Sequence, residues 1–406
     1  MKVLDTFAGA GGFSLGFELA GNYQVIGGIE FDKWAGETFQ YNHATSKVLV
    51  GDIQLYSDEF LKETFTSPPD VILGGPPCQG FSICNKNAGD SKDPRNSLFN
   101  EFIRLGKIFS PKIMVMENVP NIIKAKTGDG RWVIEIIKEE LEQLGYYTYH
   151  KILQATDYGV PQIRKRLFVI ASKEKLARPF PNPTHAVGGK ERTLFDNGLK
   201  RCPDLWDAIS DMPDIEAREG GEIMDYDKKP LNSYQTLMRD GSKQIRNNKA
   251  MNHSKRVVER FASMDCGHSV SDVPDHLKPH RRNGNGEISE RVYDQNNRRM
   301  HPDRPCHTIA ASFYANFVHP YKNRNFTPRE GARVQSFPDS FIFKGKPTVV
   351  SHKLLAREGR TSEKHLCQYN QIGNAVPPLM AKAIAQNLYN QLQHQPQNEC
   401  SFTKTI

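Results

Sequence analysis

The first 175 residues alternate between short apolar runs and longer segments with an apolar face. Short runs of apolar or β-branched residues indicate buried strands, and apolar residues three and four positions apart indicate helices. Regular alternation of this kind predicts an α/β fold with a mostly parallel sheet. The pattern predicts helices at 13–20, 96–109 and 132–144, and strands at Val3–Phe7, Val25–Ile29, Lys47–Val50, Val71–Leu73, Ile113–Met116, Tyr146–Leu153 and Arg166–Ala171.

The pattern changes after about Lys175. The chain then becomes rich in Pro, Gly, Asn, Arg and His, which predicts a smaller, irregular, β-rich second domain. A helix bearing Leu379, Ile384 and Leu388 follows, and we expect it to pack on the sheet of the first domain. The predicted organisation is a first domain at 1–175, a second at 176–345, a return segment with its helix at 346–395, and a tail at 396–406.

Composition places few limits on function. The 406 residues carry a formal charge of +8, which suits a polyanionic partner such as nucleic acid. Seven cysteines without a C-x-x-C pair argue against a disulfide framework and a zinc site, and they favour a reducing cytosol. The sequence indicates neither a targeting signal nor a membrane span, so we expect a cytoplasmic protein.

Candidate chemistry lies where the predicted strands end. Cys78 belongs to the run Gly74-Gly-Pro-Pro-Cys-Gln-Gly-Phe-Ser82, whose glycines and prolines end a strand and place the cysteine on a turned loop. Open α/β sheets bind ligands at this edge. A lone cysteine is also often a buried, inert residue. A second strand ends at Glu117, whose carboxyl group would be costly to bury alone, so it is predicted to be hydrogen-bonded or to have a raised pKa.

The N-terminal strand ends predict a nucleoside site. The turn Ala8-Gly-Ala-Gly-Gly12 leads into a helix, but Ser14 stands where a dinucleotide fingerprint requires a third glycine. A nucleoside cofactor without a pyrophosphate therefore remains. Glu30, about twenty residues further on, is placed to accept hydrogen bonds from ribose hydroxyls. Asp52 ends the third strand and adds a further acid to the same cleft.

Polar and basic segments indicate nucleic acid. The stretch Ser82–Asn96 is polar and long enough to close over a substrate. Arg164 and Arg166 share one face of an extended segment, and guanidinium groups grip phosphates well, although a charged edge strand would have the same pattern. Basic residues also gather at 243–260 and 278–304, which favours a nucleic-acid-facing module.

Together these motifs resemble the DNA (cytosine-5)-methyltransferases, which use S-adenosyl-L-methionine. The order is the family's usual one, and the pairing of Pro-Pro-Cys with Glu-Asn-Val is highly specific. The motifs are Asp5-Thr-Phe-Ala-Gly-Ala-Gly-Gly12, Glu30, Gly51-Asp-Ile53, Gly75-Pro-Pro-Cys-Gln-Gly-Phe-Ser82, Glu117-Asn-Val119, Gln162-x-Arg164-x-Arg166, Arg304-Pro-Cys-His-Thr308 and Gln371-Ile-Gly-Asn-Ala-Val376.

The resemblance implies a role for each motif. Cys78 would add to C6 of a cytosine swung out of the duplex, Glu117 would steady the ring at N3, and Arg164 would assist at the carbonyl oxygen. Arg166 joins this catalytic set. The second domain would recognise the DNA sequence. DNA contacts are expected from Gln79, Ser82, Arg164, Arg166 and Thr308, and cofactor contacts from Phe7, Ala10, Gly12, Glu30, Phe31, Asp52, Ile53, Pro77, Leu98, Asn374 and Ala375.

The expected partner is double-stranded DNA, read by a monomer that needs no metal. A cognate restriction endonuclease could belong to the same system without binding this protein stably. Such a modification enzyme would be associated with the bacterial nucleoid. One alternative is methylation of cytosine in transfer RNA, because one branch of the family has similar catalytic motifs. Another is a nucleic-acid-binding regulator on an inactive scaffold, against which the intact Cys78 and Glu117 argue. The segment 344–368 has no predicted role.

Overall fold

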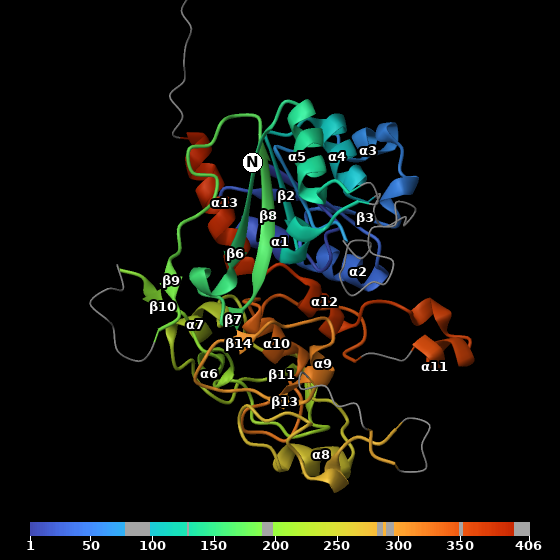
Figure 1. Cartoon of the computed structure of the whole chain (residues 1–406), viewed down its shortest axis with the longest axis vertical. Helices are drawn as coiled ribbons and strands as arrows, with labels where there is room; N and C mark the ends of the chain where they lie inside the picture. Colours follow the sequence, from blue (N-terminus) through green and yellow to red (C-terminus); the bar gives the residue numbers. More distant parts are fainter. Residues whose placement is uncertain are drawn as a thin grey trace, which may run out of the picture.

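The computed structural model describes residues 1–77, 98–127, 130–188, 198–281, 287–289, 296–348 and 352–393. Its centre is a seven-stranded sheet of order β3-β2-β1-β4-β5-β8-β6 (Figure 1). The first five strands run parallel, and β8 lies antiparallel between β5 and β6, which confirms the predicted α/β fold. The strands are β1 (Lys2–Thr6), β2 (Gln24–Glu30), β3 (Lys47–Val50), β4 (Val71–Gly74), β5 (Ile113–Asn118), β6 (Tyr147–Gln154) and β8 (Lys165–Ser172).

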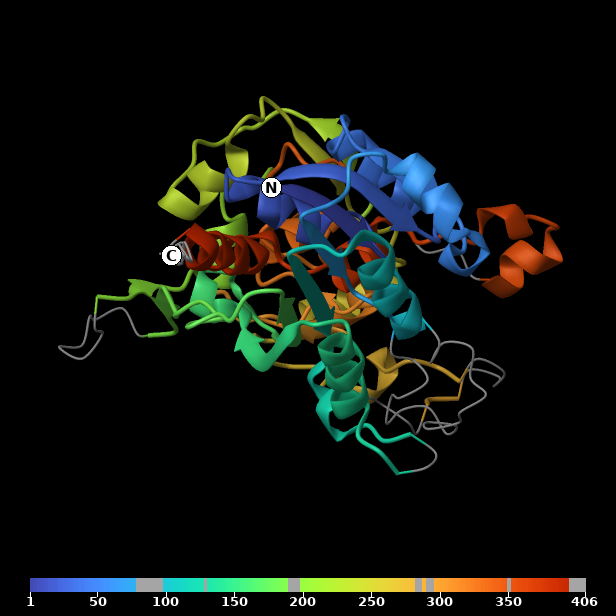
Figure 2. The same ribbon diagram turned by 90° about the horizontal axis from the view of Figure 1, so that it is seen from above.

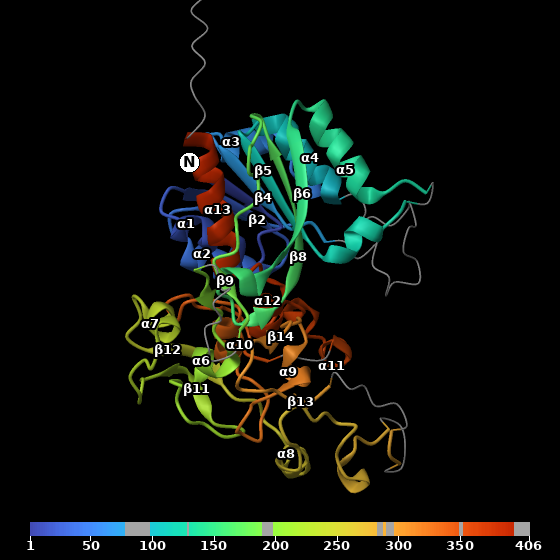
Figure 3. The ribbon, with the colours of Figure 1, turned by 60° about the vertical axis from the view of Figure 1, so that its left-hand side comes forward.

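Alternate residues of each strand supply two separate cores. Val3 and Val71 face one core, whereas Leu4 and Ile72 face the other. Side chains of successive strand residues point to opposite faces, so a parallel sheet needs helices on both sides. Figure 3 shows α1 and α13 on one face of the sheet and α4 and α5 on the other. The helices are α1 (Gly12–Leu19) and α13 (Pro378–Gln393) on the first face, and α3 (Asp58–Thr64), α4 (Leu98–Phe109) and α5 (Val133–Gln143) on the second.

Two helices of this domain are not predicted by the hydrophobic pattern. Helix α2 (Lys33–Asn42) begins after Asp32, whose side chain accepts a hydrogen bond from the Ala35 N–H. Helix α3 begins after Ser57, which caps it in the same way. N-capping side chains satisfy backbone donors that the first helical turn leaves unpaired. Here the caps, more than the apolar periodicity, mark where the helices start.

The second region is irregular, as predicted, but the predicted β-rich character is wrong. Its described strands are short, and more of its described residues lie in helices than in strands. Its core consists largely of aromatic and aliphatic side chains around α10 and α12. No helix in the described ranges is long and apolar enough to cross a membrane. The strands and α-helices described between β6 and α13, apart from β8, are β7 (Gln162–Ile163), β9 (His185–Ala186), β10 (Lys200–Arg201), α6 (Leu205–Ile209), β11 (Gly220–Met224), α7 (Ser233–Arg239), β12 (Ile245–Lys249), α8 (Lys255–Ala262), β13 (Arg298–Arg299), β14 (Cys306–His307), α9 (Phe313–Asn316), β15 (Phe317–Val318), α10 (Pro328–Val334), α11 (His352–Arg357) and α12 (Gln368–Asn374).

A buried ion-pair network fastens α10 within this region. The Arg333 guanidinium lies 2.6 Å from Asp339 and 3.0 Å from Asp211, and all three side chains are fully buried. The Arg333 Nη1 also donates to the backbone oxygen of Ala208 in α6. Charges at this depth are tolerated because each one is paired. The network therefore joins α6, α10 and the turn after α10.

Replacing Arg333 with Ala should destabilise the protein strongly. The substitution removes the guanidinium nearest to Asp339 and leaves Arg329 at 3.9 Å. Breaking a buried pair in this way costs on the order of 3–5 kcal/mol. Arg201 is the matched control, because its pair with Asp204 is half-exposed and such pairs contribute about 1 kcal/mol or less. Urea unfolding of both variants checks the difference. Equal losses of unfolding free energy would contradict this role for the network.

Candidate active site

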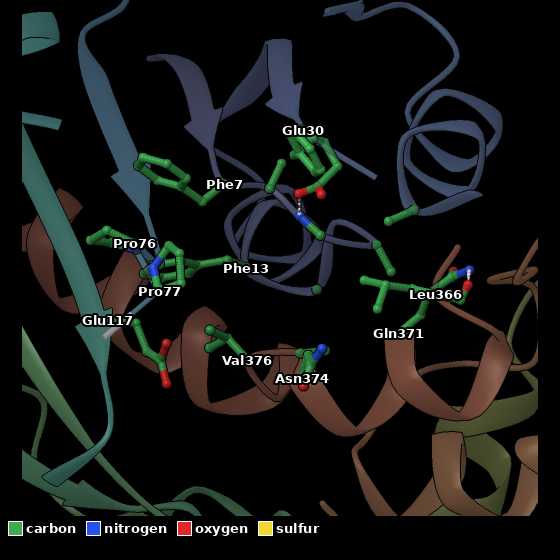
Figure 4. Close-up of a pocket in the computed structure, with 18 of the residues that line it drawn as sticks. Phe7, Phe13, Glu30, Pro76, Pro77, Glu117, Leu366, Gln371, Asn374 and Val376 are labelled. Atoms are coloured by element: carbon green, nitrogen blue, oxygen red, sulfur yellow. Dashed lines mark hydrogen bonds between the residues drawn. The ribbon is translucent and has the colours of Figure 1, made fainter. Parts of the chain in front are cut away.

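A large pocket opens where the parallel strands end. Its volume is about 990 Å³, and it is bounded by the ends of β1, β2, β4 and β5, by residues 308–311, and by α12. Protein pockets for small ligands reach about 300–1,000 Å³, so this one has room for a nucleoside cofactor and a second planar group. Figure 4 shows Glu30 and Glu117 at separate parts of the wall. The pocket thus has two ends with different chemistry.

Glycines form the pocket wall between β1 and α1, where two backbone segments come close together. Gly11 has a φ of +95°, a left-handed conformation that favours glycine, and it caps α1 without a side-chain hydrogen bond. A Cβ atom on Gly12 would lie 2.6 Å from the backbone oxygen of Val376. The glycine turn therefore lets the return segment come close to the N-terminus of α1. Helix N-termini favour the anionic groups of ligands.

Glu30 is held rigidly at the first end. Its Oε2 accepts a hydrogen bond of 2.7 Å from the Gly9 N–H, and its Oε1 accepts one of 2.8 Å from the Asp32 N–H. Burial raises the pKa of Glu30, and the two backbone donors offset part of that rise. Each carboxylate oxygen has two lone pairs, so further hydrogen bonds from ligand hydroxyls can be accepted. This geometry suits a ribose.

Glu117 and Arg166 form an ion pair at the other end. The Arg166 Nε lies 2.8 Å from the Glu117 Oε1, and both side chains are mostly buried. Burial raises the pKa of Glu117, and Arg166 counteracts only part of this effect. A carboxyl group accepts hydrogen bonds when ionised and can also donate one when protonated. The pair can therefore stabilise negative charge that develops on a bound ring.

The chain leading to Cys78 passes next to this pair. A Cβ atom on Gly75 would lie 3.5 Å from the Glu117 Oε2, and the Asn118 Nδ2 donates a 3.0 Å hydrogen bond to the Pro76 oxygen. Pro77 lines the pocket (Figure 4). Cys78, Gln79, Ser82 and the predicted closing segment up to Asn96 lie outside the described residues. Their roles stay predictions.

The phosphate contact predicted for Arg164 is wrong. Arg164 is 1% exposed, and its Nη1 donates 2.7 Å to the Ile309 oxygen. Its Nη2 donates 3.0 Å to the Gly373 oxygen and 3.1 Å to the Ala375 oxygen. Its terminal donors are thus engaged by backbone carbonyls. Both arginines line the pocket, in keeping with their period-2 spacing. Arg166 forms the ion pair with Glu117, whereas Arg164 donates to backbone oxygens.

Every described residue predicted for the site lines the same pocket. Thr308 is one of them, and its hydroxyl donates a 2.6 Å hydrogen bond to the Ile163 oxygen. A residue must line the pocket to act there, but its position in the wall does not by itself show which role it has. The lining set includes Phe7, Ala10, Gly12, Glu30, Phe31, Asp52, Ile53, Pro77, Leu98, Glu117, Arg164, Arg166, Thr308, Asn374 and Ala375.

Asp5, Leu366 and Gln371 are among the lining residues that were not predicted to act at the site. Asp5 is buried beneath the glycine turn and accepts a 2.7 Å hydrogen bond from the Ser14 hydroxyl. Leu366 and Gln371 reach the pocket from the segment before α12 and from α12 itself. Asp5 is the first residue of the first family motif, so the motif could have identified it as a site residue. Leu366 carries no comparable signal, because its placement depends on distant residues.

The fold and the pocket at the ends of its strands together suit an α/β methyltransferase. Comparison with known proteins is consistent with this class. The C-5 cytosine-specific DNA methylase model matches residues 1–390, and the chain belongs to that family. It is a DNA (cytosine-5)-methyltransferase, as the sequence predicts. Within the described ranges, no cluster of three or more His, Cys, Asp or Glu side chains is placed to hold a metal ion.

Individual relatives resemble the chain over nearly all its length. The type II methyltransferase M.DdeI of Desulfomicrobium norvegicum is 47% identical over 390 residues, covering 96% of this chain and 88% of that protein. M1.HphI of Haemophilus parahaemolyticus is 34% identical, with coverages of 95% and 86%. A crystal structure described as a DNA modification methyltransferase encoded within an Escherichia coli prophage has a TM-score of 0.71 at 27% identity, covering 97% of this chain and 99% of that one.

Substitutions at the two arginines should have different consequences. Arg166→Ala removes the partner of Glu117, so we expect methyl transfer to fall by about 10²-fold or more, measured at a temperature at which the variant is folded. Arg164→Ala deprives three buried carbonyls of their donors, so it should destabilise the fold by about 1–3 kcal/mol or more. Thermal unfolding and single-turnover kinetics separate the two effects. An Arg166→Ala enzyme of wild-type activity would contradict this assignment.

Asp5 should make stability depend on pH. Burial raises its pKa from an ordinary 3.8 to about 7, so between these values the folded chain keeps a proton that the unfolded chain releases. This contribution to stability is complete below pH 3.8 and is lost as the pH rises to 7. Asp5→Asn should gain stability relative to wild type over that interval, by up to about 4 kcal/mol. Urea unfolding at several pH values tests this, and parallel profiles would contradict it.

Proposed function

We propose that the chain transfers a methyl group from S-adenosyl-L-methionine to C5 of a cytosine within a specific duplex DNA sequence, after the base has left the helix. The observation that carries this proposal is the Glu117–Arg166 ion pair beside the backbone of Gly75 to Pro77. That backbone leads directly into Cys78. A nucleophile, a proton-sharing acid and a guanidinium are the groups that activation of cytosine requires.

The residues at this end divide the work of activating the base. C5 of cytosine is a poor nucleophile until a thiolate adds to C6, and Cys78 supplies that thiolate. Addition moves an electron pair toward N3 and O2 of the ring. Glu117, whose pKa burial raises, shares a proton with N3. Arg166 stabilises the charge at O2, the role predicted for Arg164, because the terminal donors of Arg164 are engaged by backbone oxygens. Once C5 carries the methyl group, the C5 proton is lost to water. The Cys78 sulfur then leaves C6 as a thiolate, which restores the enzyme.

The other end of the pocket fits S-adenosyl-L-methionine. Glu30 would hold the ribose, Asp52 and Ile53 would flank the adenine, and the glycine turn with Asn374 would enclose the amino-acid portion. The buried carboxylate of Glu30, fixed by two backbone donors, supports the ribose assignment. When bound, the cofactor supplies an electrophilic methyl group on a sulfonium. Leu98 and Phe31 complete the expected contacts.

We assign the second region, residues 176–345, to recognition of the DNA sequence, with 1–175 and 346–395 as the catalytic domain. The overall charge of +8 supports a polyanionic partner. The swung-out base costs a few kcal/mol of unstacking, which contacts along the duplex must offset. The enzyme acts as a monomer in the bacterial cytoplasm and protects DNA against a cognate endonuclease.

Methyl transfer from labelled cofactor tests the proposal directly. The purified full chain should methylate plasmid DNA, and bisulfite sequencing should place the product at cytosines of one short motif. Cys78→Ser should abolish turnover because a hydroxyl is too weak a nucleophile, whereas binding of the cofactor should survive. Retained binding shows that the variant is folded.

Total transfer RNA is the competing substrate in the same assay. Label confined to transfer RNA would overturn the choice of DNA. Label in neither substrate, with normal binding of DNA, would support a regulator on an inactive scaffold instead.

A further inference from the structure

The segment between Phe343 and α12, which has no predicted role, lies against α2. The Lys344 N–H donates a 2.8 Å hydrogen bond to the Thr38 hydroxyl. Gly345, at a φ of +82°, packs so closely on Trp34 that a Cβ atom would lie 2.8 Å from the ring. Helix α11 then extends away from the body of the molecule (Figures 1 and 2). After this excursion the chain returns to α2 at His365.

Asp32 fastens the returning chain. Its Oδ2 accepts a 2.9 Å hydrogen bond from the Leu366 N–H and lies 3.2 Å from the His365 Nδ1. Its Oδ1 simultaneously caps α2 through the Ala35 N–H at 3.0 Å. The Asp32 side chain is 12% exposed, so these bonds are largely shielded from water. The His365 ring also packs on Trp34, with centroids 5.4 Å apart.

The fastened residue reaches the ligand pocket. Leu366 and Gln371 both line it, on the side away from Glu117 (Figure 4). The Gln371 Nε2 donates 2.8 Å to the Leu366 oxygen, and its Oε1 accepts a 2.7 Å bond from the Thr38 hydroxyl. Leu366 is therefore held at its N–H by Asp32 and at its carbonyl by Gln371.

Asp32 also touches the opposite wall. Its own N–H donates to the Glu30 carboxylate at 2.8 Å. One residue thus positions both the proposed ribose ligand and the apolar wall contributed by Leu366. We propose that Asp32 is a positioning residue that shapes the cofactor end of the pocket by clamping the chain at His365 and Leu366 onto α2. This inference rests on the proposed function, because the ligand is the nucleoside sulfonium cofactor.

The substitution Asp32→Asn tests the clamp while preserving the helix cap. Asparagine caps helices as well as aspartate does. When the asparagine oxygen caps α2, the asparagine NH2 group faces the Leu366 N–H. Two donors then face each other, so the hydrogen bond to Leu366 is lost. Losing a hydrogen bond to a charged group should weaken binding of S-adenosyl-L-methionine about tenfold. Titration calorimetry of the full-length protein measures this dissociation constant.

Kinetics distinguish positioning from general damage to the fold. At saturating cofactor, Asp32→Asn should keep the wild-type kcat, while KM for the cofactor rises in step with the dissociation constant. Leu366→Ala should show the same split because it removes the wall itself. Arg360→Ala is the matched control in the same segment, since Arg360 pairs only with the exposed Glu358 and Glu363 in the described structure. It should bind the cofactor as wild type does.

Two outcomes would overturn the clamp. One is wild-type affinity in Asp32→Asn, and the other is an equal loss of affinity in Arg360→Ala. Failure of the wild-type protein itself to bind S-adenosyl-L-methionine would instead overturn the proposed function. The comparison of variants with wild type therefore separates the two claims.

Discussion

The ion pair of Glu117 with Arg166 is the interaction on which the site depends. A carboxyl group at the end of a buried strand would be costly alone, and Arg166 on the neighbouring antiparallel strand β8 makes it tolerable. Burial nevertheless keeps the pKa of Glu117 above its ordinary value. The register of β5 with β8 thus fixes both the stability and the reactivity of this end of the pocket.

The rest of the molecule keeps the two ends of the pocket in a fixed relation. Arg164 joins the strand next to Glu117 to the backbone around Gly373 and Ala375, which border the cofactor end. Asn118, which follows Glu117 in β5, donates a hydrogen bond to the Pro76 oxygen. A group that attacks and a group that donates must be held to within fractions of an ångström of each other. Buried hydrogen bonds to backbone atoms provide that rigidity.

Much of the sheet could be predicted from local pattern, because a strand buried on both faces is a short apolar run. The strand ends with Glu30, Asp52 and Glu117 followed from the same runs, since the carboxyl ends of parallel strands meet at one edge. Period-2 spacing placed Arg164 and Arg166 on one face but could not separate their roles. The carbonyls that engage Arg164 lie 145 to 211 residues away. The position of Leu366 likewise depends on Asp32, 334 residues distant.

The central claim is that the sulfur of Cys78 forms a bond to a cytosine ring. The most direct measurement is incubation of the full-length enzyme with its cofactor and a duplex carrying 5-fluorocytosine at the methylated position. Fluorine at C5 cannot leave as a proton does, so the adduct should accumulate. Mass spectrometry of the digested complex should find the nucleotide on the peptide that contains Cys78. A nucleotide on a different cysteine, or methylated product without any adduct, would contradict the account.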